Sequence, residues 1–120
     1  GAELPPPPPP PPSLPPVSGP MQMLSFFQFR AFPPHELSPL QARLEETLRQ
    51  LNARGTVYLA PEGLNAQLCV PVGAVEALRA ALSQLLGLQP NLAEVVDAER
   101  RPFEKLVVRQ RAQVLTDGLP

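Results

Sequence analysis

The residue types with catalytic potential are scarce in this 120-residue chain, in which Cys69 and His35 each occur once. A nucleophilic cysteine needs a neighbouring base, a cation or a loop of backbone amides to stabilise its thiolate. Cys69 instead lies in an alternating apolar run, between Leu68 and Val70, which predicts a small packed side chain in a strand. His35 has no second histidine and no acid pair at ligand spacing. The sequence therefore predicts neither a catalytic residue nor a metal site.

Half of the chain's ten lysines and arginines fall close together near its end: Arg100, Arg101, Lys105, Arg109 and Arg111. Alternate residues of a strand share a face, so Lys105, Arg109 and Arg111 are expected on one face of a regular strand. Such a face could follow the phosphates of a nucleic acid. It could equally be a solvated strand face or a surface for another domain. The formal net charge is −1, so overall charge favours neither nucleic acid nor membrane.

A β-hairpin is expected to position two further polar candidates, Glu62 and Asn65. The runs Gly55–Ala60 and Leu64–Val70 have strand-like patterns and flank a Pro-Glu-Gly turn. The proline has the φ required at the second position of a type I turn, and the glycine can adopt positive φ after it. This predicts a hairpin with a three-residue loop. Glu62 and Asn65 then either bond local backbone or contact a partner.

Two amphipathic helices are expected before and after the hairpin. The first should begin at a capping box, Ser38-Pro39-Leu40-Gln41, and end before Gly55. The second should run from about Val72 to Leu86 and end at Gly87. Apolar residues recur in both at spacings of three and four, which predicts one core-facing side per helix. These residues are Leu40, Leu44, Leu48 and Leu51 in the first helix, and Val75, Leu78, Leu82 and Leu85 in the second.

Further strands complete an α+β plan. Met23–Arg30 predicts a central strand whose phenylalanines, Phe26, Phe27 and Phe29, are expected mainly in the core. Leu92–Val96 could form a short additional strand. In the last strand, Leu106, Val108, Ala112 and Val114 alternate with the cations. The order β-α-β-β-α-β predicts a ferredoxin-like, or acylphosphatase-like, fold: an antiparallel sheet with two helices on one face.

Proteins with this fold have many functions, and for two of these functions the required residues can be looked for in the sequence. Acylphosphatase chemistry needs a glycine-rich phosphate loop after the first strand. Here Arg30–His35 holds no glycine, and its two prolines remove amide donors. RNA-recognition motifs stack bases on aromatic residues of both central strands. The strand Leu64–Val70 has no aromatic residue and no matching signature, which argues against an ordinary member of that class.

Residues 55–65, Gly-Thr-Val-Tyr-Leu-Ala-Pro-Glu-Gly-Leu-Asn, resemble the G-T-x-x-x-A-x-E-G-I/L-N segment of the rhodanese-domain tRNA uridine hydroxylases. The resemblance extends from about Leu24 to Leu115 and includes Phe103–Arg109, which is similar to that family's closing strand. It implies an acylphosphatase-like N-terminal domain. In the family, a rhodanese domain with the catalytic cysteine follows this domain. These 120 residues contain no rhodanese domain.

The resemblance also implies roles and partners. The chain itself is expected to be non-catalytic and to hold no cofactor, while its full-length parent is expected to hydroxylate the wobble uridine of tRNA. Expected partners are tRNA, bound weakly through the parent, and a covalently linked rhodanese domain. The candidate RNA or interdomain contacts are Glu62, Asn65 and the five cations. The alternative is a stand-alone adaptor module with a proline-rich recruitment tail.

The first 20 residues contain 11 of the 19 prolines, and Pro5–Pro12 favours extended polyproline II. Such a run is either a ligand for an SH3- or WW-type domain or a semi-rigid spacer. We therefore expect a disordered tail over 1–20, the domain over 21–115 and the start of a linker over 116–120. A single cysteine and the lack of a membrane-length apolar run favour an intracellular, cytoplasmic protein without membrane contact.

Overall fold

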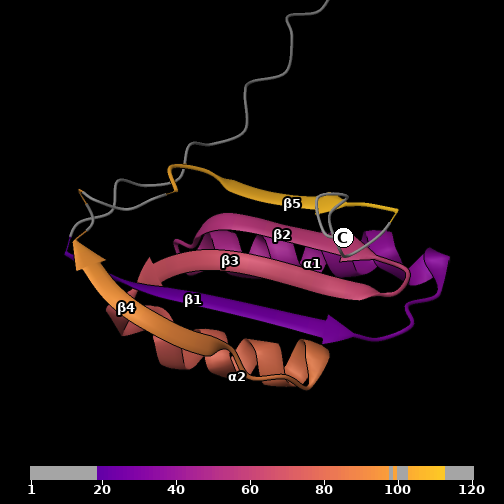
Figure 1. The fold of residues 1–120 in the computed structure, drawn as a ribbon, viewed down its shortest axis with the longest axis horizontal. Helices are drawn as coiled ribbons and strands as arrows, with labels where there is room; N and C mark the ends of the chain where they lie inside the picture. Colours follow the sequence, from indigo (N-terminus) through magenta and orange to yellow (C-terminus); the bar gives the residue numbers. More distant parts are fainter. Residues whose placement is uncertain (1–18, 98, 100–102, 113–120) are drawn as a thin grey trace, which may run out of the picture.

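The computed structural model describes residues 19–97, 99 and 103–112, which form one five-stranded sheet with two helices on one face (Figure 1). Segment 1–18, Arg100, Arg101, Val114 and the expected linker 116–120 lie outside the described residues. In chain order the elements are β1 (Pro20–Phe29), α1 (Pro34–Gln50), β2 (Arg54–Ala60), β3 (Gly63–Pro71), the 3-10 turn η1 (Val72–Ala74), α2 (Val75–Leu86), β4 (Asn91–Asp97) and β5 (Leu106–Gln110).

The strand order across the sheet is β4-β1-β3-β2-β5. Strand β1 pairs antiparallel with β3 and β4, and β2 pairs antiparallel with β3. These four strands and the two helices form the predicted ferredoxin-like α+β plan, which is confirmed. Strand β5 is an addition to it, because it pairs with β2 in parallel and makes the sheet mixed.

The roles expected of the last two strands are therefore exchanged. We predicted that the strand around Leu106 closes the plan and that Leu92–Val96 is an accessory strand. Instead β4 closes the plan against β1, and β5 extends the opposite edge. The reason is that β4 is an edge strand with almost every residue exposed, so its sequence shows little apolar alternation.

The hairpin differs from its prediction in loop length. Ala60 pairs with Gly63, so the loop has two residues, Pro61 and Glu62, and Gly63 is the first residue of β3. The φ of Gly63 is +151°, which is positive but extended rather than left-handed helical. A Cβ atom on Gly63 would overlap the carbonyl oxygen of Gln28 on the neighbouring strand. Glycine is needed here for close backbone approach as well as for its φ.

Helix α1 begins and ends earlier than predicted. It starts at Pro34, which occupies the first turn, so Ser38 and Gln41 lie inside the helix and form no capping box. Both side chains instead contact β5, since Gln110 Nε2 donates to Ser38 Oγ at 3.0 Å and to Gln41 Oε1 at 2.8 Å. The helix ends at Gln50, and the positive φ of 59° just beyond it belongs to Asn52 rather than to Gly55.

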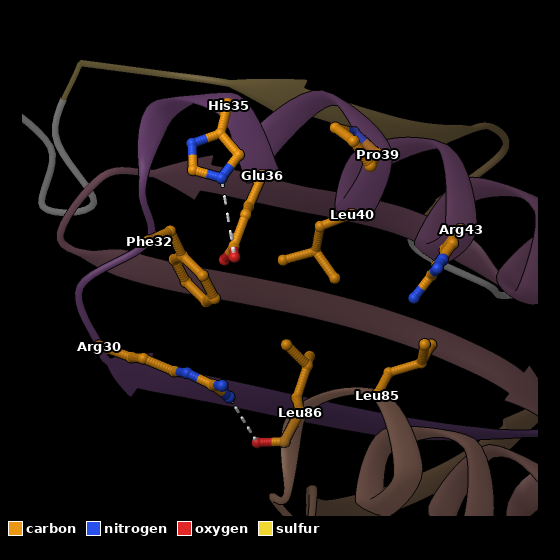
Figure 2. Close-up of a pocket in the computed structure, with 9 residues that line it drawn as sticks. All are labelled: Arg30, Phe32, His35, Glu36, Pro39, Leu40, Arg43, Leu85 and Leu86. Atoms are coloured by element: carbon orange, nitrogen blue, oxygen red, sulfur yellow. Dashed lines mark hydrogen bonds and ion pairs between the residues drawn. The ribbon is translucent and has the colours of Figure 1, made fainter.

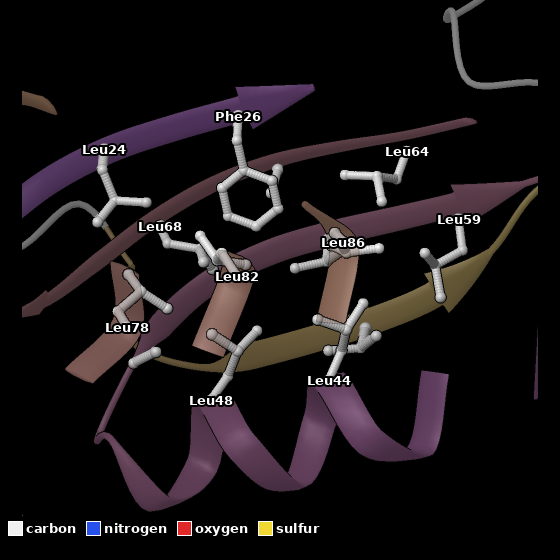
Figure 3. Close-up of a cluster of buried hydrophobic side chains, with 14 of the residues drawn as sticks. Leu24, Phe26, Leu44, Leu48, Leu59, Leu64, Leu68, Leu78, Leu82 and Leu86 are labelled. Carbon is white, nitrogen blue, oxygen red and sulfur yellow. The ribbon is translucent and has the colours of Figure 1, made fainter. Parts of the chain in front are cut away.

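The core lies between the sheet and the two helices (Figure 3). The predicted apolar sides of the helices are confirmed: Leu44, Leu48, Val75, Leu78 and Leu82 are buried, and Leu40, Leu51 and Leu85 pack against them partly buried. The predicted end of α2 is also confirmed, because Gly87 caps it in the left-handed conformation. In the described part of the chain, no helix is long and apolar enough to cross a membrane.

Candidate nucleic-acid interface

The face of the sheet opposite α1 and α2 is the candidate interface, and we call it the open face. No helix or strand of the described chain covers it (Figure 1). Strand alternation assigns its positions, because β-strand neighbours point to opposite faces and the helix-facing residues are known from the core. Its central residues are Ser25, Phe27 and Phe29 from β1, Asn65 and Gln67 from β3, Thr56 and Tyr58 from β2, and Val107 and Arg109 from β5.

Two phenylalanines on β1 are exposed on this face. Phe27 and Phe29 have relative exposures of 63% and 65%, and their rings meet edge to face with centroids 5.9 Å apart. The prediction that the phenylalanines belong to the core is wrong for these two and correct for Phe26, which is buried in it. The run Phe-Phe-Gln-Phe places aromatic rings on both faces of β1, and only one face is covered by helices.

The pairing register aligns four different side chains across the sheet. Phe27 pairs with Asn65, Asn65 pairs with Tyr58, and Tyr58 pairs with Arg109. Paired residues of neighbouring strands point to the same face. A row of aromatic ring, amide, aromatic ring and guanidinium therefore crosses from β1 through β3 and β2 to β5, and we call it the central row.

The predicted basic residues lie at the β5 end of the central row. Lys105, Arg109 and Arg111 are all exposed, and Lys105 and Arg111 directly flank β5. The guanidinium carbon of Arg111 lies 3.5 Å from the centroid of the Tyr58 ring, and the Arg111 amide donates to Leu59 O at 2.6 Å. This stacking holds the guanidinium on the open face while leaving its N–H groups available to an anion.

The two polar candidates from the hairpin lie apart. Asn65 is at the centre of the open face, and beside it a hollow of about 290 Å³ is lined by Thr56, Tyr58, Asn65, Gln67 and Phe103. Glu62 is at the exposed tip of the hairpin, where its carbonyl oxygen accepts from the Arg30 amide at 2.9 Å. The geometry thus places Asn65 in the central row with Arg109, whereas Glu62 lies at the tip of the hairpin.

Sequence reasoning missed most of this surface. The residues that were not among the predicted contacts are Ser25, Phe27, Phe29, Thr56, Tyr58, Gln67, Phe103 and Val107. One signal was available for Phe27 and Phe29, because they alternate with Leu24, Phe26 and Gln28 and so had to point away from them.

Comparison with known proteins agrees with this architecture. Residues 21–114 match the family model described as the UPF0176 acylphosphatase-like domain. The chain belongs to this family. It is 36% identical over 108 residues to a tRNA uridine(34) hydroxylase of Escherichia coli O9:H4 (strain HS), and 35% identical over 106 residues to the protein of that name in Shigella dysenteriae serotype 1 (strain Sd197). Both alignments cover 85% of this chain but only 29% of the relative.

Solved structures support the fold. The structure titled "BlrB - a BLUF protein, dark state structure" matches with a TM-score of 0.55 at 13% identity, covering 79% of this chain and 76% of that one. At this level of identity the likeness concerns the chain path of the acylphosphatase-like domain alone.

Cys69 of this acylphosphatase-like domain is fully buried. It packs with Met21 and with the partly buried Met23, Val96 and Phe103. This is the small packed role that its sequence position predicted, and it keeps the thiol away from solvent. Among the residues that the structure describes, no group of three or more His, Cys, Asp or Glu side chains could hold a metal ion.

A second hollow lies on the opposite side of the molecule, between the helices (Figure 2). It has a volume of about 420 Å³ and adjoins the β1–α1 connection, the place of the phosphate loop in an acylphosphatase-like domain. The Arg30 and Phe32 amides are already bonded to Glu62 O and Pro61 O, at 2.9 and 2.8 Å, and two prolines follow. Two amides of this connection are thus engaged, and the two prolines have none to offer. The hollow is lined by Arg30, Phe32, His35, Glu36, Pro39, Leu40, Arg43, Leu85 and Leu86.

Proposed function

We propose that this chain is the non-catalytic N-terminal domain of a tRNA-modifying enzyme and that it contacts RNA through its open face. The central row is the observation that carries the proposal. Arg109 and the stacked Arg111 supply positive charge at one end of a surface that also offers aromatic rings and amides. The name of the curated relatives, tRNA uridine(34) hydroxylase, supports tRNA as the RNA and hydroxylation as the activity of the parent.

The distribution of charge supports an anionic partner. The open-face positions of β1, β2, β3 and β5 carry no acidic residue, whereas Arg109 lies on β5 and Lys105 and Arg111 lie beside it. The exposed acid Glu94 is on β4 at the far edge, and Asp97, which pairs with Pro20, lies on the helix side of the same strand. A phosphate backbone is therefore attracted to the β2–β5 side of the open face.

The first prediction concerns this charge. Replacing Arg109 and Arg111 together by alanine should weaken binding by a similar factor for different tRNA species and reduce the slope of log K against log salt by about 1–2. Phosphate contacts act through counterion release and carry no sequence information, which is why the loss should be uniform. Fluorescence titration at several salt concentrations measures both quantities. The expected affinity of the chain is that of sequence-independent binding, with a Kd of about 10 µM or weaker at physiological salt.

A matched control is available on the helices. Arg49 and Arg79 are partly exposed arginines paired with Glu45 and Glu76 on α1 and α2. Replacing both by alanine removes the same formal charge from the other side of the molecule. If this control variant and the Arg109/Arg111 variant lose the same affinity, net charge alone explains binding and the open face is not the interface.

The second prediction concerns catalysis. The purified chain should show neither acyl-phosphate hydrolysis nor sulfur transfer from thiosulfate, because the Arg30 and Phe32 amides are engaged, two prolines follow them and the Cys69 thiol is buried. Both assays are colorimetric. Turnover that disappears in Cys69→Ser would show that Cys69 is a nucleophile and would contradict the non-catalytic role.

Domain organisation and the adaptor alternative are also proposals. We propose a tail over 1–20, the domain over 21–115 and a linker from 116 to a rhodanese domain that completes the parent enzyme. The exposed pair Phe27 and Phe29 is the observation that favours a protein partner, which would be that rhodanese domain or, for a stand-alone adaptor, another protein. Full RNA affinity in the Arg109/Arg111 variant would favour this alternative.

A further inference from the structure

The exposed side chains of Phe27 and Phe29 indicate which form of RNA the open face binds. Attraction of phosphates by the cations does not, because every RNA has phosphates. Resting on the proposed function, we propose that the open face binds unpaired nucleotides of RNA. Bases stack on Phe27 and Phe29, their edges meet the amides of Asn65 and Gln67, and the backbone runs along β5. The proposal rests on the exposure of these rings, on the central row and on the opposite charges of the β5 and β4 edges of the sheet.

The rings are available for stacking. Phe27 and Phe29 are each more than three-fifths exposed, and they contact each other edge to face, an arrangement that leaves most of the ring faces free. Stacking of a base on an exposed aromatic ring strengthens binding about 5- to 150-fold. Loss of the aromatic pair is therefore expected to weaken binding measurably.

The central row separates the part that stacks bases from the part that binds phosphate. Phe27 on β1 and Tyr58 on β2 are separated by one strand, β3, so they lie about 10 Å apart at a strand spacing of about 4.8 Å. The Arg111 guanidinium already stacks on the Tyr58 ring, so the bases are left to Phe27 and Phe29. Asn65 pairs with Phe27 and has both a donor and an acceptor in its amide. A base on Phe27 therefore has a hydrogen-bonding group beside it, on the side toward the cations.

The charge gradient orients the strand of RNA. The cations lie at the β5 side, the aromatic pair lies on β1, and the acid Glu94 lies beyond it on β4. Phosphates are favoured along β5 and disfavoured over β4, so the bases should point from β5 toward β1. Double-stranded RNA cannot use this arrangement, because its bases are stacked within the helix and hide their faces.

The test compares single-stranded with duplex RNA. The probes are a fluorescein-labelled 12-nucleotide RNA of mixed sequence without self-complementarity and the same RNA annealed to its complement, each titrated with the full chain. We expect tighter binding of the single strand. In Phe27→Ala/Phe29→Ala, single-strand affinity should fall about 10- to 100-fold with an unchanged salt slope, since stacking releases no counterions. In Arg109→Ala/Arg111→Ala, affinity for both probes and the salt slope should fall together.

The matched control is Leu92→Ala/Val95→Ala. These two apolar side chains are also exposed, at 46% and 53%, but they lie on β4 opposite Leu24 and Gln22, on the helix side. This variant should bind both probes like the original chain. Circular dichroism checks that each variant is folded, and Phe29→Trp gives a direct signal, because stacking of a base quenches indole fluorescence.

The outcomes separate the inference from the proposed function. Equal affinity for single strand and duplex, or full single-strand affinity in the Phe27/Phe29 variant, overturns base stacking but leaves electrostatic RNA contact standing. No binding of either probe by the original chain overturns both. Quenching of Phe29→Trp by the single strand and not by the duplex supports the inference even if the double alanine variant does not fold.

Discussion

Phe26→Ala is expected to lower the free energy of unfolding by about 3–5 kcal/mol, whereas Phe27→Ala should change it by no more than about 0.5 kcal/mol. The two residues are neighbours in β1, but Phe26 is 1% exposed and packs in the core, while Phe27 is 63% exposed on the open face. Truncating Phe26 leaves a cavity among Leu24, Leu82 and the other core residues (Figure 3). Truncating Phe27 leaves no cavity.

Urea denaturation followed by circular dichroism measures both effects. Each variant serves as the control for the other. Both replace phenylalanine by alanine at neighbouring positions of β1, so they remove the same atoms and change the intrinsic β-propensity equally. Total stability of a domain is about 5–15 kcal/mol, so Phe26→Ala can be largely unfolded without denaturant, and Phe26→Leu then gives a smaller loss in the same direction. Similar losses for Phe26→Ala and Phe27→Ala would mean that another part of the chain covers the open face.

Gly63→Ala is expected to lower the free energy of unfolding by about 2–6 kcal/mol. Of this, about 1–3 kcal/mol is strain at a φ of +151°, and about 1–3 kcal/mol is the displacement of backbone that a Cβ would overlap. The new methyl group would meet the Gln28 carbonyl and lie 3.1 Å from the Phe29 Cα. Neither is the end of a flexible side chain, so β1 or β3 would have to move.

Gly73→Ala is the control for this prediction. Gly73 lies in η1, and a Cβ there would meet nothing within 4 Å. Its loss of stability should stay within about 0.5 kcal/mol. The two variants are compared by thermal unfolding. A thermal midpoint for Gly63→Ala that equals that of Gly73→Ala would show that the backbone of β1 does not approach the hairpin as closely as described.

Local sequence patterns predicted a helix or strand correctly where only one interpretation of the pattern was available. The leucine spacing of α1 and α2 identified their buried sides, and Gly87 identified the end of α2. Where two local patterns could each mark the start of a helix, the prediction chose the wrong one. Ser38-Pro39 matches a capping box, but Pro33-Pro34 begins the helix one turn earlier, and the Ser38 hydroxyl bonds to Gln110 instead.

The candidate site was predicted in part. The basic character of the last strand and the common face of Arg109 and Arg111 follow from sequence alone, because side-chain alternation is a local property of a strand. That Arg111 stacks on Tyr58 does not follow from it, since these residues meet only through the parallel pairing of β2 with β5. The pairing of two strands that are far apart in the sequence cannot be recognised from the local pattern of either strand.

The sequence by itself therefore determined the α+β class, the apolar sides of the helices, the packed role of Cys69 and the family resemblance. Only the tertiary structure decided which face of the sheet the helices cover, and hence that Phe26 is buried while Phe27 and Phe29 are exposed. It also decided that β4 closes the plan and that β5 brings the cations beside Tyr58. The physical reason is that periodicity records the two sides of an element, whereas burial depends on which distant element packs against each side.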